Sequence, residues 1–144
     1  MRSRAAEHEQ GGRRDRERPP LPEPLPHPVV DNHCHLDIAD GPDGAWLEAG
    51  EALRRAADVG VTRIVQIGCD LPGARWAVQA AHAHEQVVAG VALHPNEAPR
   101  LAGEGAMERA FAEIVSLAED PRVRAVGETG LDYFRTGEDG CSAQ

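Results

Sequence analysis

Two histidines one residue apart, His33 and His35, stand at the end of a short apolar stretch that begins at Val29. Alternate side chains of a β-strand share a face, so the two imidazoles would lie about 7 Å apart along the chain. Neutral imidazole is a common ligand for divalent metal ions. The pair could therefore form half of a metal site. A lone His-x-His is also compatible with one histidine bonded to a loop and the other in solvent.

A carboxylate in a similar position stands near the other end of the chain. Residues 123–127 predict a strand that ends directly before Glu128, inside a glycine-flanked polar turn. A third apolar run, residues 87–93, is followed by His94. We expect His94 to contact a substrate phosphate or to support its loop, and the sequence does not decide between the two.

The remaining pattern predicts the elements that must position these groups. Strands begin near residues 29, 61, 87 and 123, and each but the last is followed by a helix. Three sets of apolar residues at helical spacing mark these helices: Trp46, Ala49, Leu53 and Ala56; Trp76, Ala77, Ala80 and Ala81; Met107, Ala110, Phe111, Ile114 and Ala118. We expect Trp46 to pack in the core. A β-α repeat at this spacing predicts a parallel sheet with right-handed crossovers. All candidate polar groups then lie at strand carboxyl ends, which form the active end of a (β/α)8 barrel.

Three motifs together resemble the TatD family of metal-dependent nucleases. Asp31-Asn32-His33-Cys34-His35-Leu36-Asp37 is similar to the family's D-x-H-x-H-L-D. Gly127-Glu128-Thr129-Gly130-Leu131-Asp132-Tyr133 is similar to its G-E-x-G-L-D-Y, and Gly90-Val91-Ala92-Leu93-His94-Pro95 to its G-x-H-P segment, with extra residues between Gly and His. The resemblance covers the chain from about residue 28.

The resemblance implies an α/β fold of the TIM type, a (β/α)8 barrel, that hydrolyses phosphodiester bonds of DNA, commonly as a 3′-exonuclease. His33, His35 and Glu128 would hold divalent cations, two in number, with Mg²⁺ expected and Mn²⁺ or Zn²⁺ as alternatives. Such ions lower the pKa of water and neutralise phosphate charge. Supporting or substrate-binding roles fall to Asp31, Asp37, His94 and Asp132, and Asp132 could instead cap a turn.

Two other functions remain open at this stage. His-x-His on a first strand is shared with metal-dependent amide and ester hydrolases of the wider amidohydrolase group, although the motif around Glu128 favours the nuclease branch. The chain could also be a truncated product without catalytic activity.

Length bears on these alternatives. A full barrel takes about 250 residues, whereas this chain has 144 and offers four strands. We therefore expect residues 28–144 to be the N-terminal half of a barrel. The family's remaining two histidines and its aspartate, the expected general base, would lie beyond residue 144. The chain by itself is expected to be a poor nuclease and marginally stable.

Composition separates an N-terminal extension from this body. Residues 1–27 are rich in Arg and Pro and lack apolar periodicity, so we expect them to be disordered and dispensable. The net charge is −9, and all fifteen basic residues are Arg. Residues 27–144 contain nine Arg and nineteen acids, which argues against a simple phosphate-binding surface.

Cysteine usage and hydropathy bear on the compartment. Three irregularly spaced cysteines indicate neither a disulfide framework nor a zinc knuckle. No apolar run is long enough for a membrane helix, and no apolar signal segment is evident. We expect a cytoplasmic protein with DNA as its partner, no membrane association and no obligate protein partner.

Overall fold

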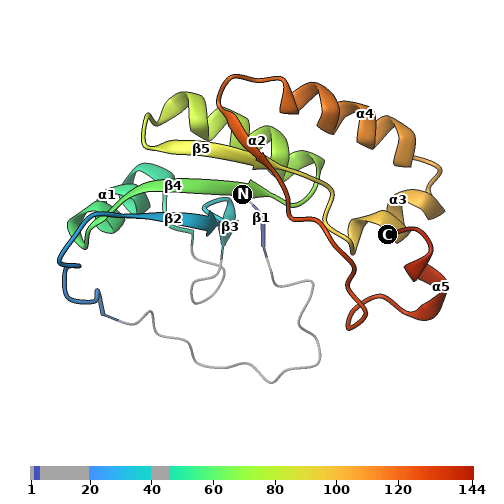
Figure 1. Ribbon diagram of the computed structural model, residues 1–144, viewed down its shortest axis with the longest axis horizontal. Helices are drawn as coiled ribbons and strands as arrows, with labels where there is room; N and C mark the ends of the chain where they lie inside the picture. The colour runs from blue at the N-terminus through green and yellow to red at the C-terminus, as the bar shows by residue number, and fades with distance from the viewer. Residues whose placement is uncertain (1, 4–19, 40–45) are drawn as a thin grey trace.

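The computed structural model describes residues 2–3, 20–39 and 46–144 of the chain (Figure 1). Its centre is a four-stranded parallel sheet in the order β2-β4-β5-β6. These strands are Val29–Cys34, Val61–Gly68, Val87–Val91 and Val123–Val126. Strands that are neighbours in this sheet also follow one another in order along the chain, without the reversal of order that marks a doubly wound fold. This is the arrangement of successive strands in a (β/α)8 barrel, which confirms the predicted fold class.

Helices connect the strands and cover the sheet. The helices are α1 Ala49–Asp58, α2 Leu71–Ala83, α3 Glu97–Gly103, α4 Met107–Ala118 and α5 Glu138–Cys141. α1 packs on β4, α2 on β4 and β5, and α4 on β6 and α2. Figure 1 shows α2 and α4 side by side above the strands. The short helices α3 and α5, which the sequence pattern did not predict, contact each other beyond the carboxyl ends of the strands.

Local sequence explains where α2 begins. The Asp70 carboxylate accepts a hydrogen bond from the Gly73 backbone N–H at 2.7 Å, as an N-cap residue does. Gly68 ends β4 just before this cap, and a Cβ atom at Gly68 would overlap the backbone of Ala74. A side chain larger than hydrogen at Gly68 would therefore push α2 away from the sheet.

The core lies between the sheet and its helices and is built from aliphatic side chains. It includes Leu53 of α1, Ile64 of β4, Val87 of β5, Ile114 of α4 and the alanines on the inner face of α2. Burial of such side chains contributes about 1.5–3 kcal/mol each for the larger ones. A core without buried aromatics agrees with a sequence that has only five Trp, Tyr and Phe residues.

The expected burial of Trp46 was wrong. α1 begins at Ala49, after Glu48 has capped it through the Glu51 backbone N–H. Trp46 therefore precedes the helix, is 37% exposed and donates its indole N–H to the Leu36 carbonyl at 3.0 Å.

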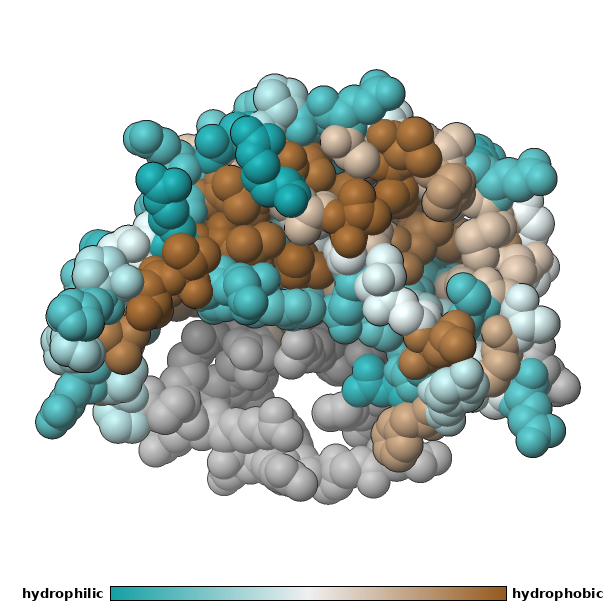
Figure 2. Space-filling view, viewed as in Figure 1, coloured by the Kyte–Doolittle hydropathy of each residue, from teal (hydrophilic) through white to brown (hydrophobic). Residues whose placement is uncertain are grey.

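Phe111 lies within α4 but faces outward, 62% exposed. Figure 2 shows hydrophobic residues gathered along this face of the molecule, over the sheet and α4.

The N-terminal segment is only partly described. Residues 1 and 4–19 of the expected extension lie outside the described residues, so its predicted disorder stays a prediction. Strand β1, Arg2–Ser3, pairs in parallel with β3, Ile38–Ala39. Residues 20–27 are exposed, and the Leu25 backbone N–H donates to the Val59 carbonyl at 3.0 Å. In the part of the chain that the structure describes, no helix has the length and apolar character needed to cross a membrane.

Candidate metal centre

The two histidines of the first motif lie at the carboxyl end of β2. The register between β2 and β4 shifts between Asp31 and Cys34, so β2 carries an extra residue there. Such bulges re-aim side chains near functional sites. The rings of His33 and His35 meet edge to face with their centroids 5.1 Å apart. Cys34, between them, is partly buried and packs against the core.

The tautomer of His35 is set by the backbone. Its Nδ1 lies 3.1 Å from the Ile67 carbonyl oxygen, which can only accept, so Nδ1 carries the proton. Nε2 therefore keeps its lone pair for a metal ion. Burial lowers the pKa of His35 below its usual value, and the hydrogen bond to Ile67 opposes that shift. The neutral ring that a metal requires is thus favoured.

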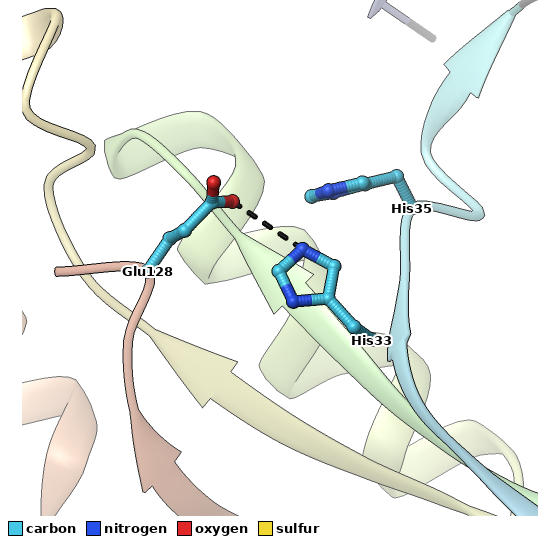
Figure 3. A group of neighbouring side chains, drawn as sticks. All are labelled: His33, His35 and Glu128. Carbon is cyan, nitrogen blue, oxygen red and sulfur yellow. Dashed lines mark ion pairs between the residues drawn. The ribbon is translucent and has the colours of Figure 1, made fainter. Parts of the chain in front are cut away.

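Glu128 reaches the histidines from the opposite edge of the sheet (Figure 3). Its Oε2 lies 3.3 Å from Nε2 of His33. Ligand atoms of His33, His35 and Glu128 all lie within 4.8 Å of one another. Within residues 2–3, 20–39 and 46–144, this is the one group of three or more His, Cys, Asp or Glu side chains placed to share an ion. The structure therefore brings together the three residues that the sequence singled out as ligands.

The donor set fits a divalent cation. Two imidazole nitrogens and one carboxylate oxygen are the three protein ligands of one type of catalytic zinc site, which leaves a further position open. With metal bonds of about 2.0–2.1 Å, neighbouring ligands of a tetrahedral ion lie roughly 3.4 Å apart. The His33–Glu128 distance of 3.3 Å is close to that value.

His94 joins the cluster through the second oxygen of Glu128. Its Nε2 lies 3.3 Å from Glu128 Oε1. The Asn96 backbone N–H donates to His94 Nδ1 at 3.1 Å, so that nitrogen carries no proton and Nε2 does. His94 thus presents an N–H donor to the cluster, whereas His35 presents a lone pair. The hydrogen bond from Asn96 also supports the loop after β5, which was one of the two roles expected for His94.

The other predicted residues support the surrounding loops. The Asp31 carboxylate accepts a hydrogen bond from the His33 backbone N–H at 3.0 Å, so it contacts the backbone of this histidine. Asp132 accepts from the Phe134 and Arg135 backbone N–H groups at 2.9 and 3.0 Å. The Arg135 hydrogen bond lowers the pKa of Asp132. Asp132 therefore caps a turn, which was the alternative role expected for it.

Asp37 is 3% exposed and depends on a residue that the sequence reading missed. Gln66, fully buried in β4, donates to Asp37 Oδ1 at 2.9 Å and accepts from the Leu36 backbone N–H at 2.7 Å. These bonds fix the chain that leaves His35. The available signal was a glutamine set between two apolar residues in the predicted strand 61–67, because buried polar groups need partners.

Cys69 is a second residue that sequence reasoning left out of the site. Its thiol donates to Glu128 Oε2 at 3.5 Å and lies 4.0 Å from His35 Nδ1. Cys69 directly follows β4, at the same end of the sheet as the histidines. No spacing rule links a single cysteine to a distant carboxylate, so only the folded chain shows this contact.

Comparison with known proteins agrees with this geometry. The profile of the family described as TatD related DNase matches residues 30–144. The chain belongs to the TatD-related DNase family. That match spans β2 through α5, and it includes His33, His35 and Glu128.

Among individual relatives of this TatD-related chain, two are named for metal dependence and a third for exonuclease activity. An uncharacterized metal-dependent hydrolase TatD of Mycobacterium tuberculosis is 42% identical over 115 residues, covering 79% of this chain and 41% of the relative. The metal-dependent hydrolase YabD of Bacillus subtilis is 32% identical over 105 residues, covering 73% and 38%. A 3'-5' ssDNA/RNA exonuclease TatD of Erwinia tasmaniensis is 31% identical over 90 residues, covering 62% and 33%. The TatD-related chain thus spans about two-fifths of the length of the curated relatives it matches.

Proposed function

We propose that this chain supplies the first part of the active site of a metal-dependent phosphodiester hydrolase that acts on DNA from the 3′ end. The observation that carries the proposal is the meeting of His33, His35 and Glu128 at the carboxyl ends of β2 and β6. The exonuclease named among the relatives supports the substrate class.

The chain's own residues divide the work. His35 offers the lone pair of Nε2, because its Nδ1–H is hydrogen-bonded to the Ile67 carbonyl. His33 and Glu128 complete the donor set. The Nε2–H of His94 lies near Glu128 Oε1 in this structure. It would donate to a phosphate oxygen placed beside it. A divalent cation bound by these donors would lower the pKa of an attacking water and neutralise phosphate charge.

The donor set also bears on the choice of metal. Mg²⁺ prefers oxygen ligands, whereas imidazole suits Zn²⁺ and other transition metals. With two nitrogens among three donors, we propose that Mn²⁺ or Zn²⁺ binds more tightly here than Mg²⁺. A second ion at Glu128 would need ligands in addition to these three side chains.

The test follows shortening of a 5′-labelled single-stranded oligonucleotide by the purified 144-residue chain with Mn²⁺, Zn²⁺ or Mg²⁺. We expect slow, metal-dependent loss from the 3′ end that ceases with EDTA and in the double variant His33→Ala, His35→Ala. His82→Ala is the matched control, because His82 is an exposed histidine on α2 away from the cluster.

Two outcomes would contradict the proposal. Digestion that persists in the double variant would show that the activity does not use this cluster. Metal-dependent hydrolysis of an ester or amide substrate, with the oligonucleotide left intact, would place the chain with the amide and ester hydrolases.

A further inference from the structure

An open pocket of about 320 Å³ adjoins the candidate metal centre. His94, Pro95 and Glu128 line one part of it, and residues 129–134 line the rest. Its volume is near the lower end of the range for small-ligand sites, about 300–1,000 Å³. A group that reaches the cluster from this side would therefore pass along the segment that follows Glu128.

Two aromatic side chains of that segment are turned to solvent. Phe134 is 94% exposed and Tyr133 is 73% exposed. The chain has only five Trp, Tyr and Phe residues, and two of them are adjacent and exposed at this one pocket. Exposed large apolar groups of this kind commonly mark binding sites.

The loop that carries Phe134 is fixed by hydrogen bonds on both sides. Asp132 accepts from the Phe134 backbone N–H and also from Asn96 Nδ2, at 2.9 and 3.0 Å. Thr136 donates its hydroxyl to Asn96 Oδ1 at 3.0 Å, and the Asp132 N–H donates to Gln144 Oε1 at 3.0 Å. The segment between β6 and α5 (Figure 1) is thus tied to α3 through its cap residue and to the C-terminal residue. A loop held in this way presents its aromatic ring with little ordering cost on binding.

The charge of the chain makes such a ring more important. Residues 27–144 carry nineteen acids against nine Arg, and the pocket itself includes Glu128 and Asp132. A nucleic acid backbone gains little attraction from this surface. Stacking of a base on an aromatic face does not depend on charge and works for any base.

From these observations we propose that Phe134, with Tyr133 beside it, is the stacking platform for one nucleobase of the single-stranded substrate whose phosphate lies at Glu128 and His94. This inference rests on the proposed function and adds to it the residue that contacts the base. It implies weak dependence of binding on salt and little preference among the four bases.

The test compares two probes of equal length by fluorescence anisotropy, a labelled thymidine hexanucleotide and its abasic counterpart, with Ca²⁺ and again with EDTA. The 144-residue chain should bind the thymidine strand about tenfold or more tightly than the abasic strand, as expected for one stacked base. Phe134→Ala should lose most of that preference, whereas Phe134→Trp should keep it. Phe111→Ala is the matched control, since Phe111 is also exposed but lies on α4.

The outcomes separate this inference from the proposed function. Equal binding of the two probes, or an unchanged preference in Phe134→Ala, would overturn the stacking site; metal-dependent shortening of DNA in the same preparation would leave the proposed function standing. Loss of preference in Phe111→Ala would place the base on α4 and would also overturn it. Failure to bind either probe, together with absence of cleavage, would count against both. Circular dichroism of each variant confirms that the fold is retained.

Discussion

Glu128 Oε2 lies 3.3 Å from His33 Nε2, although His33 is near the end of β2 and Glu128 follows β6, the strands at opposite edges of the sheet. Three steps of about 4.8 Å separate the edges of a flat four-stranded sheet, roughly 14 Å in all. The carboxyl ends of the strands must therefore curve toward a common point for these side chains to meet. Such curvature belongs to a barrel wall, and it places metal donors from distant parts of the chain in one cluster.

Removal of a metal donor should weaken metal binding by at least about tenfold, because even partners that only orient ligands contribute 10–100-fold. We expect this for His33→Ala, His35→Ala and Glu128→Gln in calorimetric titrations of the 144-residue chain with Zn²⁺ or Mn²⁺. His82→Ala should leave the affinity unchanged. Equal affinity in all four variants would show that the ions bind elsewhere.

Loss of the buried amide of Gln66 should destabilise the fold. Gln66→Leu removes the donor to Asp37 and the acceptor for the Leu36 N–H in a place without solvent access. The expected cost is about 1–3 kcal/mol in the free energy of unfolding, measured by urea denaturation. The same change at exposed Gln79 on α2 should cost less than about 0.5 kcal/mol. Similar losses at both positions would contradict a special role for Gln66.

Gly68 should not tolerate a methyl group. Gly68→Ala would force its Cβ into the backbone of Ala74 and move α2 off the sheet, at about 1–3 kcal/mol. Gly103→Ala at the end of α3 meets nothing within 4 Å and should be neutral or slightly stabilising. Thermal unfolding of the two variants beside the parent chain decides the matter, and a stable Gly68→Ala variant would show that the contact is loose.

Asp120 should give the stability of the chain a pH dependence in the acid range. His82 Nε2 lies 2.9 Å from its carboxylate, and this bond, with the Arg122 backbone N–H, lowers the pKa of Asp120. Because the folded pKa lies below the unfolded value, the unfolded chain binds the proton first as pH falls. The stabilisation is therefore complete above about pH 4 and is lost as pH falls through the folded pKa.

The measurement compares the parent chain with Asp120→Asn by denaturant unfolding at several pH values. The difference in unfolding free energy should shrink as pH falls below about pH 4, where Asp120 becomes protonated. Glu119→Gln, at the adjacent exposed residue, is the control and should show no such trend. A difference that grows on acidification would reverse the sign of the linkage and contradict the assignment.

Much of this protein is determined by local sequence. The sequence pattern predicted strands at 61–67 and 87–93, and the Asp70 cap with the spacing of Ala77, Ala80 and Ala81 predicted a helix. These predictions lie close to the observed bounds, because periodicity and capping act within a few residues. The motifs also pointed to His33, His35 and Glu128, since each directly follows or ends a strand of one parallel sheet.

Only the tertiary structure decided how those side chains face one another. The lone pair of His35 and the N–H of His94 depend on contacts with Ile67 and with Asn96, and the first of these lies on another strand. Gln66 and Cys69 join the site through hydrogen-bond partners far away in sequence. Trp46 lies outside the core because α1 starts three residues after it. Patterns of neighbouring residues carry no information on such contacts, since curvature of the sheet and packing of the whole chain set those distances.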